Sequence, residues 1–129
     1  MEAGQTQQVT EELLLNLTEC KSLSEISVLS LRNKKLEACM KVLAQCVNLM
    51  IVYLQNNRIS VNDMQKNMGN FNSLQKIDLS FNQIKKLPDQ KCFSQLKNLK
   101  VLYLHDNLIG TWDDLEHITT IPSLMHLTL

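Results

Sequence analysis

An eleven-residue pattern of apolar residues occurs four times in this chain, and a fifth copy ends after six residues. The copies begin at Ile26, Leu49, Leu74, Leu99 and Leu124, so successive starts lie 23, 25, 25 and 25 residues apart. Self-similarity at a period of this size predicts a solenoid, because each repeat forms one coil that buries its apolar side only against neighbouring coils. The repeat therefore constrains the architecture more than any other feature.

The pattern within each copy predicts one short strand per coil. Apolar residues at the fourth and sixth positions alternate with other residues at the period of two that is typical of strands. We expect the first, fourth and sixth side chains to point inward and the strands of successive coils to align in parallel. The last apolar position of each copy continues this stack. It is occupied by Leu36, Ile59, Ile84 and Ile109.

The segments between the copies are predicted to be helical or 3-10 helical. Apolar residues recur three and six positions before each copy, and a spacing of three places them on one helical face. The two sets are Leu23, Cys46, Phe71, Leu96 and Ile121, and Cys20, Leu43, Met68, Phe93 and Ile118. Pro88 predicts that the third connection starts irregularly, with a short helix from about Asp89 or Ser94. The expected fold class is therefore α/β: a right-handed horseshoe with a parallel concave sheet and helical convex segments.

The ninth position of the pattern holds asparagine in three copies, at Asn57, Asn82 and Asn107. The chain must turn sharply after each strand, and this turn leaves backbone donors and acceptors in a dry interior. An asparagine amide both donates and accepts hydrogen bonds, so the stacked side chains are predicted to form a structural ladder. An isolated asparagine after a strand would be an ordinary turn residue. The first copy has Lys34 in this column, as expected for an edge coil that water can reach.

Three segments are predicted along the chain. Residues 1–8 are polar and are expected to be a flexible N-terminus, residues 9–22 an N-terminal capping helix, and residues 23–129 the repeats. The last copy stops within its strand pattern, so we expect the chain to be a fragment or one stretch of a longer protein.

The predicted capping helix has a clear start. Thr10 is a suitable N-cap, and two glutamates follow it at the positive end of the helix dipole. Leu13, Leu17 and Cys20 are predicted to form the apolar stripe that covers the open end of the sheet. Such a cap is expected because the first coil has no neighbour on its outer side.

The charge balance argues against a nucleic-acid partner. Thirteen basic and thirteen acidic side chains give a net charge of zero, whereas nucleic-acid binding requires a basic excess. Five lysines, Lys85, Lys86, Lys91, Lys97 and Lys100, cluster in the sequence and are interpreted as a solvated convex edge.

The remaining composition points to the cytoplasm. The N-terminus lacks a secretion signal, and no stretch has the apolar length of a membrane span, so membrane insertion is not expected. The four cysteines, Cys20, Cys39, Cys46 and Cys92, have no C-x-x-C spacing and are expected to be free thiols in a reducing compartment.

Alternation places the third, fifth and seventh positions of each copy on the concave face. Tyrosines and aliphatic residues from two coils are then expected to flank a lysine and an aspartate from the coil between them, which is a composition typical of interface hot spots. The predicted partner-binding residues are Ile51, Tyr53, Lys76, Asp78, Val101, Tyr103 and His105. The alternative is that the two tyrosines only pack against their neighbours on a solvated sheet.

Catalysis and cofactor binding find no support in the residue pattern. His105, His117 and His126 lack metal-ligand spacing with cysteine or aspartate, and the three glycines do not form a phosphate-binding loop. No cofactor and no enzymatic activity are therefore predicted.

The pattern L-x-x-L-x-L-x-x-N-x-I/L, intact in three copies, resembles the leucine-rich repeat family over residues from about 20 to 129. Helical connections such as Trp112 to Ile118 are similar to its intracellular subclass. That subclass includes a regulator of type-1 protein phosphatase and an axonemal dynein light chain. The segments Val52 to Asn57 and Gln83 to Asn107 are most similar to ciliary members, among them proteins that combine these repeats with a calmodulin-binding IQ motif. No IQ motif is present here, so calmodulin binding is not implied.

The resemblance implies a non-enzymatic scaffold for protein–protein interactions, with a role in the cilium, axoneme or cytoskeleton. Its implied partners are proteins, with axonemal or microtubule-associated proteins as the more specific class, and its implied location is the cytoplasm or cilium. The alternative reading is a regulatory subunit that docks on an enzyme such as a protein phosphatase.

Overall fold

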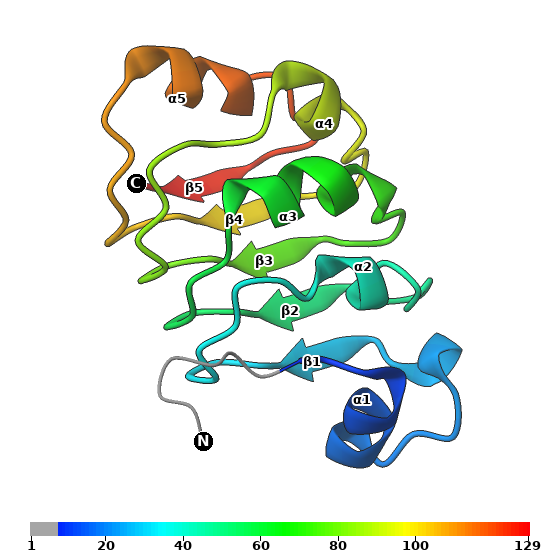
Figure 1. Ribbon diagram of the computed structural model, residues 1–129. Helices are drawn as coiled ribbons and strands as arrows, with labels where there is room; N and C mark the ends of the chain where they lie inside the picture. Colours follow the sequence, from blue (N-terminus) through cyan, green and yellow to red (C-terminus); the bar gives the residue numbers. More distant parts are fainter. Residues whose placement is uncertain (1–7) are drawn as a thin grey trace.

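The computed structural model describes residues 8–129, so most of the predicted flexible segment, residues 1–7, lies outside the described residues. Five short strands form one open, fully parallel sheet in the order β1-β2-β3-β4-β5 (Figure 1). Their bounds are β1 Val28–Ser30, β2 Ile51–Tyr53, β3 Lys76–Asp78, β4 Val101–Tyr103 and β5 His126–Thr128. Each strand pairs with the next so that equivalent repeat positions are aligned, which confirms the predicted α/β solenoid.

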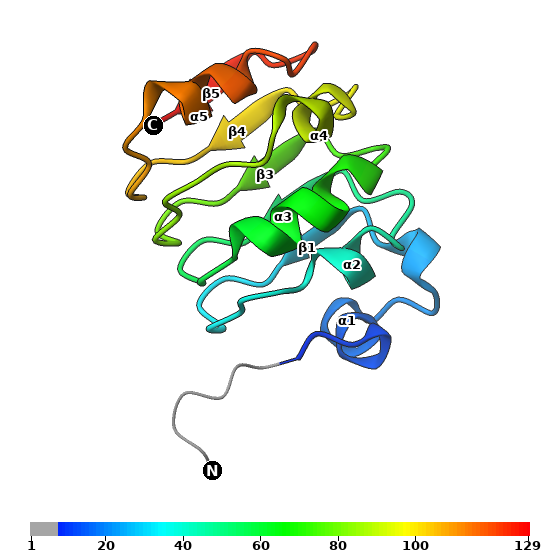
Figure 2. The same ribbon diagram turned by 45° about the horizontal axis from the view of Figure 1, so that its top comes forward.

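The connections are helical, and Figures 1 and 2 show them as a second layer on one face of the sheet. They comprise η1 Leu23–Glu25, α2 Met40–Leu43, α3 Val61–Asn67, η2 Met68–Asn70, α4 Gln90–Ser94 and α5 Trp112–Ile118. Side chains at the N-caps Ser60, Asp89 and Thr111 each accept a hydrogen bond from the backbone N–H three residues later. Helix α4 therefore begins after Asp89, the first of the two starts predicted from Pro88.

The core lies between the sheet and the helical layer. The central residues of the first four strands, Leu29, Val52, Ile77 and Leu102, are at most 2% exposed. Leu127, their counterpart in β5, is 39% exposed, because β5 pairs with a neighbour on one side only within the described residues. Burial against adjacent coils, rather than within one repeat, therefore produces the core.

The cysteines are free thiols, and three of them belong to this core. Burial raises the pKa of Cys46 and of Cys92 above the ordinary value of a thiol, and it raises the pKa of Cys39 most strongly. A buried thiol with a raised pKa is a weak nucleophile, so these side chains act as small apolar residues.

Helix α1, Glu11–Thr18, lies beside the β1 end of the sheet (Figure 1). The hydroxyl of Thr10 caps it by accepting a hydrogen bond from the backbone N–H of Leu13. The predicted apolar stripe is displaced, however. Leu14, which the stripe omitted, is fully buried, whereas Leu17 is 45% exposed. The helix therefore packs through a face one residue away from the predicted face.

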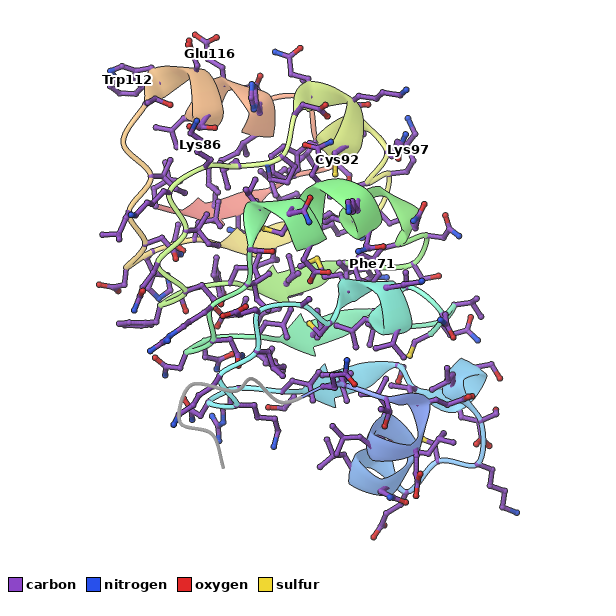
Figure 3. The ribbon with its side chains drawn as sticks, in the orientation of Figure 1. Phe71, Lys86, Cys92, Lys97, Trp112 and Glu116 are labelled. Atoms are coloured by element: carbon purple, nitrogen blue, oxygen red, sulfur yellow. The ribbon has the colours of Figure 1, made fainter. Side chains whose placement is uncertain are left out.

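The lysines that cluster in the sequence do not form one surface. Figure 3 shows Lys86 on the side of the molecule where the strands end and Lys97 on the opposite side, where the chain approaches β4. The reason is geometric: the helical connection carries the chain from one edge of the sheet back to the other. All five lysines are exposed, as the interpretation of solvated side chains predicted, but Lys86 and Lys97 do not share one edge.

Candidate functional site

The seven predicted partner-binding residues lie on or directly beyond three adjacent strands. Strand register aligns Ile51 with Lys76 and Val101, and it aligns Tyr53 with Asp78 and Tyr103. All of these side chains are partly exposed, while the residue between each pair is buried toward the helices. Alternation along a strand therefore places the six side chains on the face opposite the helical layer, which we call the concave face. His105 follows β4 and extends the same column.

Lys76 occupies the centre of this face. Its ammonium nitrogen lies 5.4 Å from the ring centroid of Tyr53 and 5.1 Å from that of Tyr103. These distances fall within the range in which a cation is attracted to the face of an aromatic ring. One lysine thus bridges rings from the two neighbouring strands, and the three side chains form a cation–aromatic clamp.

Asp78 does not need the Lys76 ammonium as its partner. One oxygen of its carboxylate accepts hydrogen bonds from the backbone N–H of Ser80 at 3.0 Å and from the hydroxyl of Ser80 at 2.6 Å. The carboxylate is therefore held at the end of β3 by its own turn. The two charged side chains therefore contact different groups: the Lys76 ammonium lies near the two tyrosine rings, and the Asp78 carboxylate accepts hydrogen bonds from Ser80.

His105 connects the clamp to the turns that follow the strands. Its Nδ1 atom lies 2.7 Å from the hydroxyl oxygen of Thr128, in the adjacent strand. Its ring lies 6.0 Å from the ring of Tyr103 and meets the ring of Phe81 edge-on at 5.8 Å. These contacts extend the aromatic surface from Tyr53 to Phe81.

Phe81 adjoins His105 and was not among the predicted partner-binding residues. Its side chain is 48% exposed, and its backbone has a φ of 58°, in the left-handed region. The equivalent residues of the other copies, Asn33, Asn56 and Asp106, have φ values of 60°, 59° and 58°. Asparagine and aspartate tolerate this conformation far better than a bulky residue does, so phenylalanine is the strained member of the column. An exposed aromatic residue in a strained position is a reason to suspect function.

The predicted ladder residues lie in the turns beneath this surface, and Asn82 shows their geometry. Its side-chain oxygen accepts a hydrogen bond from the backbone N–H of Ile59 at 3.0 Å. Its side-chain nitrogen donates to the carbonyl oxygens of Leu54 and Leu79 at 2.9 and 3.1 Å. One amide thus serves two successive coils. Asn57 and Asn107 make the corresponding hydrogen bonds in the neighbouring turns.

The comparison with known proteins agrees with this geometry. A family described as "Leucine Rich repeats (2 copies)" matches residues 72–117. This chain is a leucine-rich repeat protein. It is 37% identical over 91 residues to "Leucine-rich repeat and IQ domain-containing protein 3" of Homo sapiens, and 39% identical over 90 residues to the Mus musculus protein of the same name. Each alignment covers 70% of this chain but only 14% of the relative. Leucine-rich repeats are generally non-enzymatic interaction modules.

These leucine-rich repeats contain a second polar ladder, at the edge where the chain enters each strand. The side chains of Asn48, Ser73, Asn98 and Ser123 each donate a hydrogen bond to a backbone carbonyl of the preceding coil, over 2.7 to 2.9 Å. Sequence reasoning missed this ladder. Its signal is the alternation of asparagine and serine at intervals of 25 residues, directly before the first leucine of each of the last four copies.

Two buried aspartates join the coils on the helical side of the repeats. The carboxylate of Asp63 accepts hydrogen bonds from the backbone N–H groups of Cys39 and Met40 in the preceding coil, at 2.9 and 3.1 Å. Asp114 accepts in the same way from the N–H of Leu87 at 3.1 Å. Neither aspartate was predicted from the sequence. Asp63 lies six residues after Asn57 and Asp114 lies seven residues after Asn107, so the two do not occupy the same position of the repeat.

Within residues 8–129, no group of three or more histidine, cysteine, aspartate or glutamate side chains is placed to hold a metal ion. Over the same residues, no helix combines the length and apolar character required to cross a bilayer.

Proposed function

We propose that this leucine-rich repeat chain is a non-enzymatic scaffold that binds a protein partner through its concave face. The observation that carries the proposal is the clamp in which Lys76 lies between Tyr53 and Tyr103. A partner that covers the clamp excludes water from it, and a cation–aromatic contact strengthens from roughly 0.5–1 kcal/mol when exposed to about 2 kcal/mol when desolvated. Ile51, Val101 and Phe81 add apolar area around it.

The proposal extends to location. We place the scaffold in the cytoplasm and, more specifically, in the cilium, axoneme or associated cytoskeleton, with axonemal or microtubule-associated proteins as partners. Support comes from the resemblance of its repeats to those of ciliary members of the family. The chain spans only 14% of the length of each of the two relatives. Whatever a whole protein of that kind does is therefore only proposed for this chain.

The test is proximity labelling in ciliated cells, comparing the native chain with the double variant Tyr53→Ala and Tyr103→Ala. Trp112→Ala is the matched control, because Trp112 is an aromatic residue that is 81% exposed at the start of α5, away from the concave face. We expect the double variant to lose axonemal proteins that the native chain and the control both label. Labelling that is unchanged by the double variant would contradict the concave-face proposal.

The same experiment separates the alternative, a regulatory subunit that docks on a protein phosphatase. In that case, phosphatase catalytic subunits would be labelled in place of axonemal proteins. The purified chain would also bind an active phosphatase, and the substitutions at Tyr53 and Tyr103 would abolish that binding.

A further inference from the structure

A groove of about 380 Å³ lies between the second and third coils, at the edge of the sheet where the strands end. Its lining comes from two turns, residues 58–61 and residues 82–86. Ile59 and Ile84 are only 3% exposed, so they contribute an apolar base, while Val61 is 38% exposed and offers apolar contact at the surface. The groove is separate from the concave face, because none of the clamp residues lines it.

Three cations border this groove: Arg58 from the second coil, and Lys85 and Lys86 from the third. All three side chains are exposed, and no aspartate or glutamate is among the lining residues. The chain as a whole has equal numbers of acidic and basic side chains, so this concentration of positive charge is local.

Two buried carboxylates on the flanking helices, Asp63 and Asp114, accept hydrogen bonds from backbone groups of the preceding coil. Asp63, two residues after Val61, accepts hydrogen bonds from the preceding coil at Cys39 and Met40. Asp114 accepts from the backbone N–H of Leu87 and from the hydroxyl of Thr111. Both are buried, whereas the groove cations are exposed. The groove lining itself therefore carries positive charge without a carboxylate. Glu37, whose carbonyl oxygen accepts a hydrogen bond from the backbone N–H of Ser60, is an exposed carboxylate on the preceding coil.

We infer that this groove, which we call the Arg58 groove, binds an acidic segment of a protein partner in which carboxylates flank one apolar side chain. The apolar side chain would lie over Ile59, Ile84 and Val61, and the carboxylates would pair with the three cations. Arginine suits this role because its planar guanidinium can hold a carboxylate through two parallel hydrogen bonds. The apolar base favours a peptide over a nucleic acid, which would require a longer basic track.

The experiment is a selection of random dodecapeptides displayed on phage against the full chain, with counter-selection against the variant Arg58→Glu plus Lys86→Glu. Enriched peptides are synthesised with a fluorescent label, and their affinity is measured by fluorescence anisotropy. The matched control is Lys97→Glu plus Lys100→Glu, which makes the same change in net charge. Figure 3 shows Lys97 on the side of the molecule opposite Lys86, and Lys100 directly precedes β4. Circular dichroism verifies that both variants remain folded.

We expect the enriched peptides to contain aspartate or glutamate beside a leucine, isoleucine or phenylalanine. Reversal of the two groove charges should weaken binding about tenfold or more, since it replaces two attractive contacts by repulsive ones. The control variant and the double variant Tyr53→Ala and Tyr103→Ala should bind within about twofold of the native chain, because distant exposed charges are screened by salt. Binding should also weaken as salt concentration rises.

Four results would overturn the inference. They are the absence of any enriched peptide, enrichment of peptides without acidic residues, equal weakening by the groove and control variants, and undiminished affinity when the apolar residue of the peptide is replaced by serine. Equal weakening would indicate a diffuse charge effect, and the serine result would indicate charge attraction without use of the apolar base. Loss of binding in the tyrosine variant alone would assign the peptide to the concave face.

Discussion

At the scale of single residues, the polar side chains inside this solenoid form hydrogen bonds with backbone N–H and C=O groups that have no backbone partner in the turns. Asn82 is 2% exposed, and its amide bonds to backbone groups of its own coil and of the preceding one. A buried polar group that loses its partner costs more than an average hydrogen bond contributes, because it also loses its hydration.

Asn82→Leu is therefore expected to lower the free energy of unfolding by about 1–3 kcal/mol. Asn62→Leu, an exposed position in α3, is the control and should change stability little. Urea denaturation followed by circular dichroism measures both variants. An unchanged midpoint for Asn82→Leu would show that its hydrogen bonds contribute nothing to stability.

The strained residue Phe81 gives a prediction of the opposite sign. Phe81→Asn should raise the free energy of unfolding by about 1 kcal/mol, because asparagine tolerates the left-handed backbone better. The reciprocal change Asn56→Phe, at the equivalent position one coil earlier, should lower it by a similar amount. If neither substitution changed the free energy of unfolding, Phe81 would not be strained, and strain would give no reason to assign it a function.

Acid sensitivity should depend on Asp114. A hydrogen bond from the hydroxyl of Thr111 is the main cause that holds the pKa of Asp114 below its ordinary value of 3.8. A lowered pKa in the folded state contributes stability above about pH 4, and this contribution is lost as the pH falls through the folded-state pKa. Asp114→Asn should therefore lose less stability than the native chain when the pH is lowered below about 4.

The matched control for Asp114 is Asp113→Asn, since Asp113 is its exposed neighbour in the first turn of α5. Thermal unfolding measured across the acidic range compares the three proteins. Identical pH profiles for Asp114→Asn and the native chain would contradict the assignment.

At the scale of elements, the packing of helix α1 depends on one buried residue, Leu14. Leu14 is fully buried, whereas Leu17, on the predicted stripe, is 45% exposed. We propose that α1 caps the β1 end of the solenoid, because an end coil without a cover leaves its apolar side in water.

The two leucines of α1 make a direct test. Leu14→Ala should lower the free energy of unfolding by about 2–5 kcal/mol, the range for deletion of a buried leucine side chain. Leu17→Ala, an identical chemical change at an exposed position, should have a much smaller effect. Equal effects in urea denaturation would mean that α1 does not pack through Leu14.

At the scale of the whole molecule, each coil contacts only its neighbours, so stability should vary along the stack. Strands β2 to β4 have a partner on both sides, whereas β5 pairs only with β4 among the described residues. Amide hydrogen exchange followed by mass spectrometry should therefore find the strongest protection in β2 to β4 and the weakest in β5. Uniform protection across the sheet would indicate a single cooperative unit.

Much of the fold of this molecule can be predicted from the repeat alone. Asn57, Asn82 and Asn107 stand at one register of a repeated pattern, and each is followed two residues later by isoleucine. A period of about 25 residues allows little other than stacked coils, so the parallel sheet and its concave face follow from the spacing. The aligned columns that contain Tyr53 and Tyr103 follow as well, because alternation along a strand decides which side chains share a face.

Other features required the folded chain. The sequence places Lys86 near Lys97, but the helical connection sends them to opposite edges and brings Lys86 to the groove bordered by Arg58. Likewise, Lys76 is two residues from Asp78, yet its ammonium lies between rings that come from positions 53 and 103. A period determines how coils stack, because that depends on a pattern that recurs. The partner that a long side chain chooses depends on distances between coils, which only the tertiary structure sets.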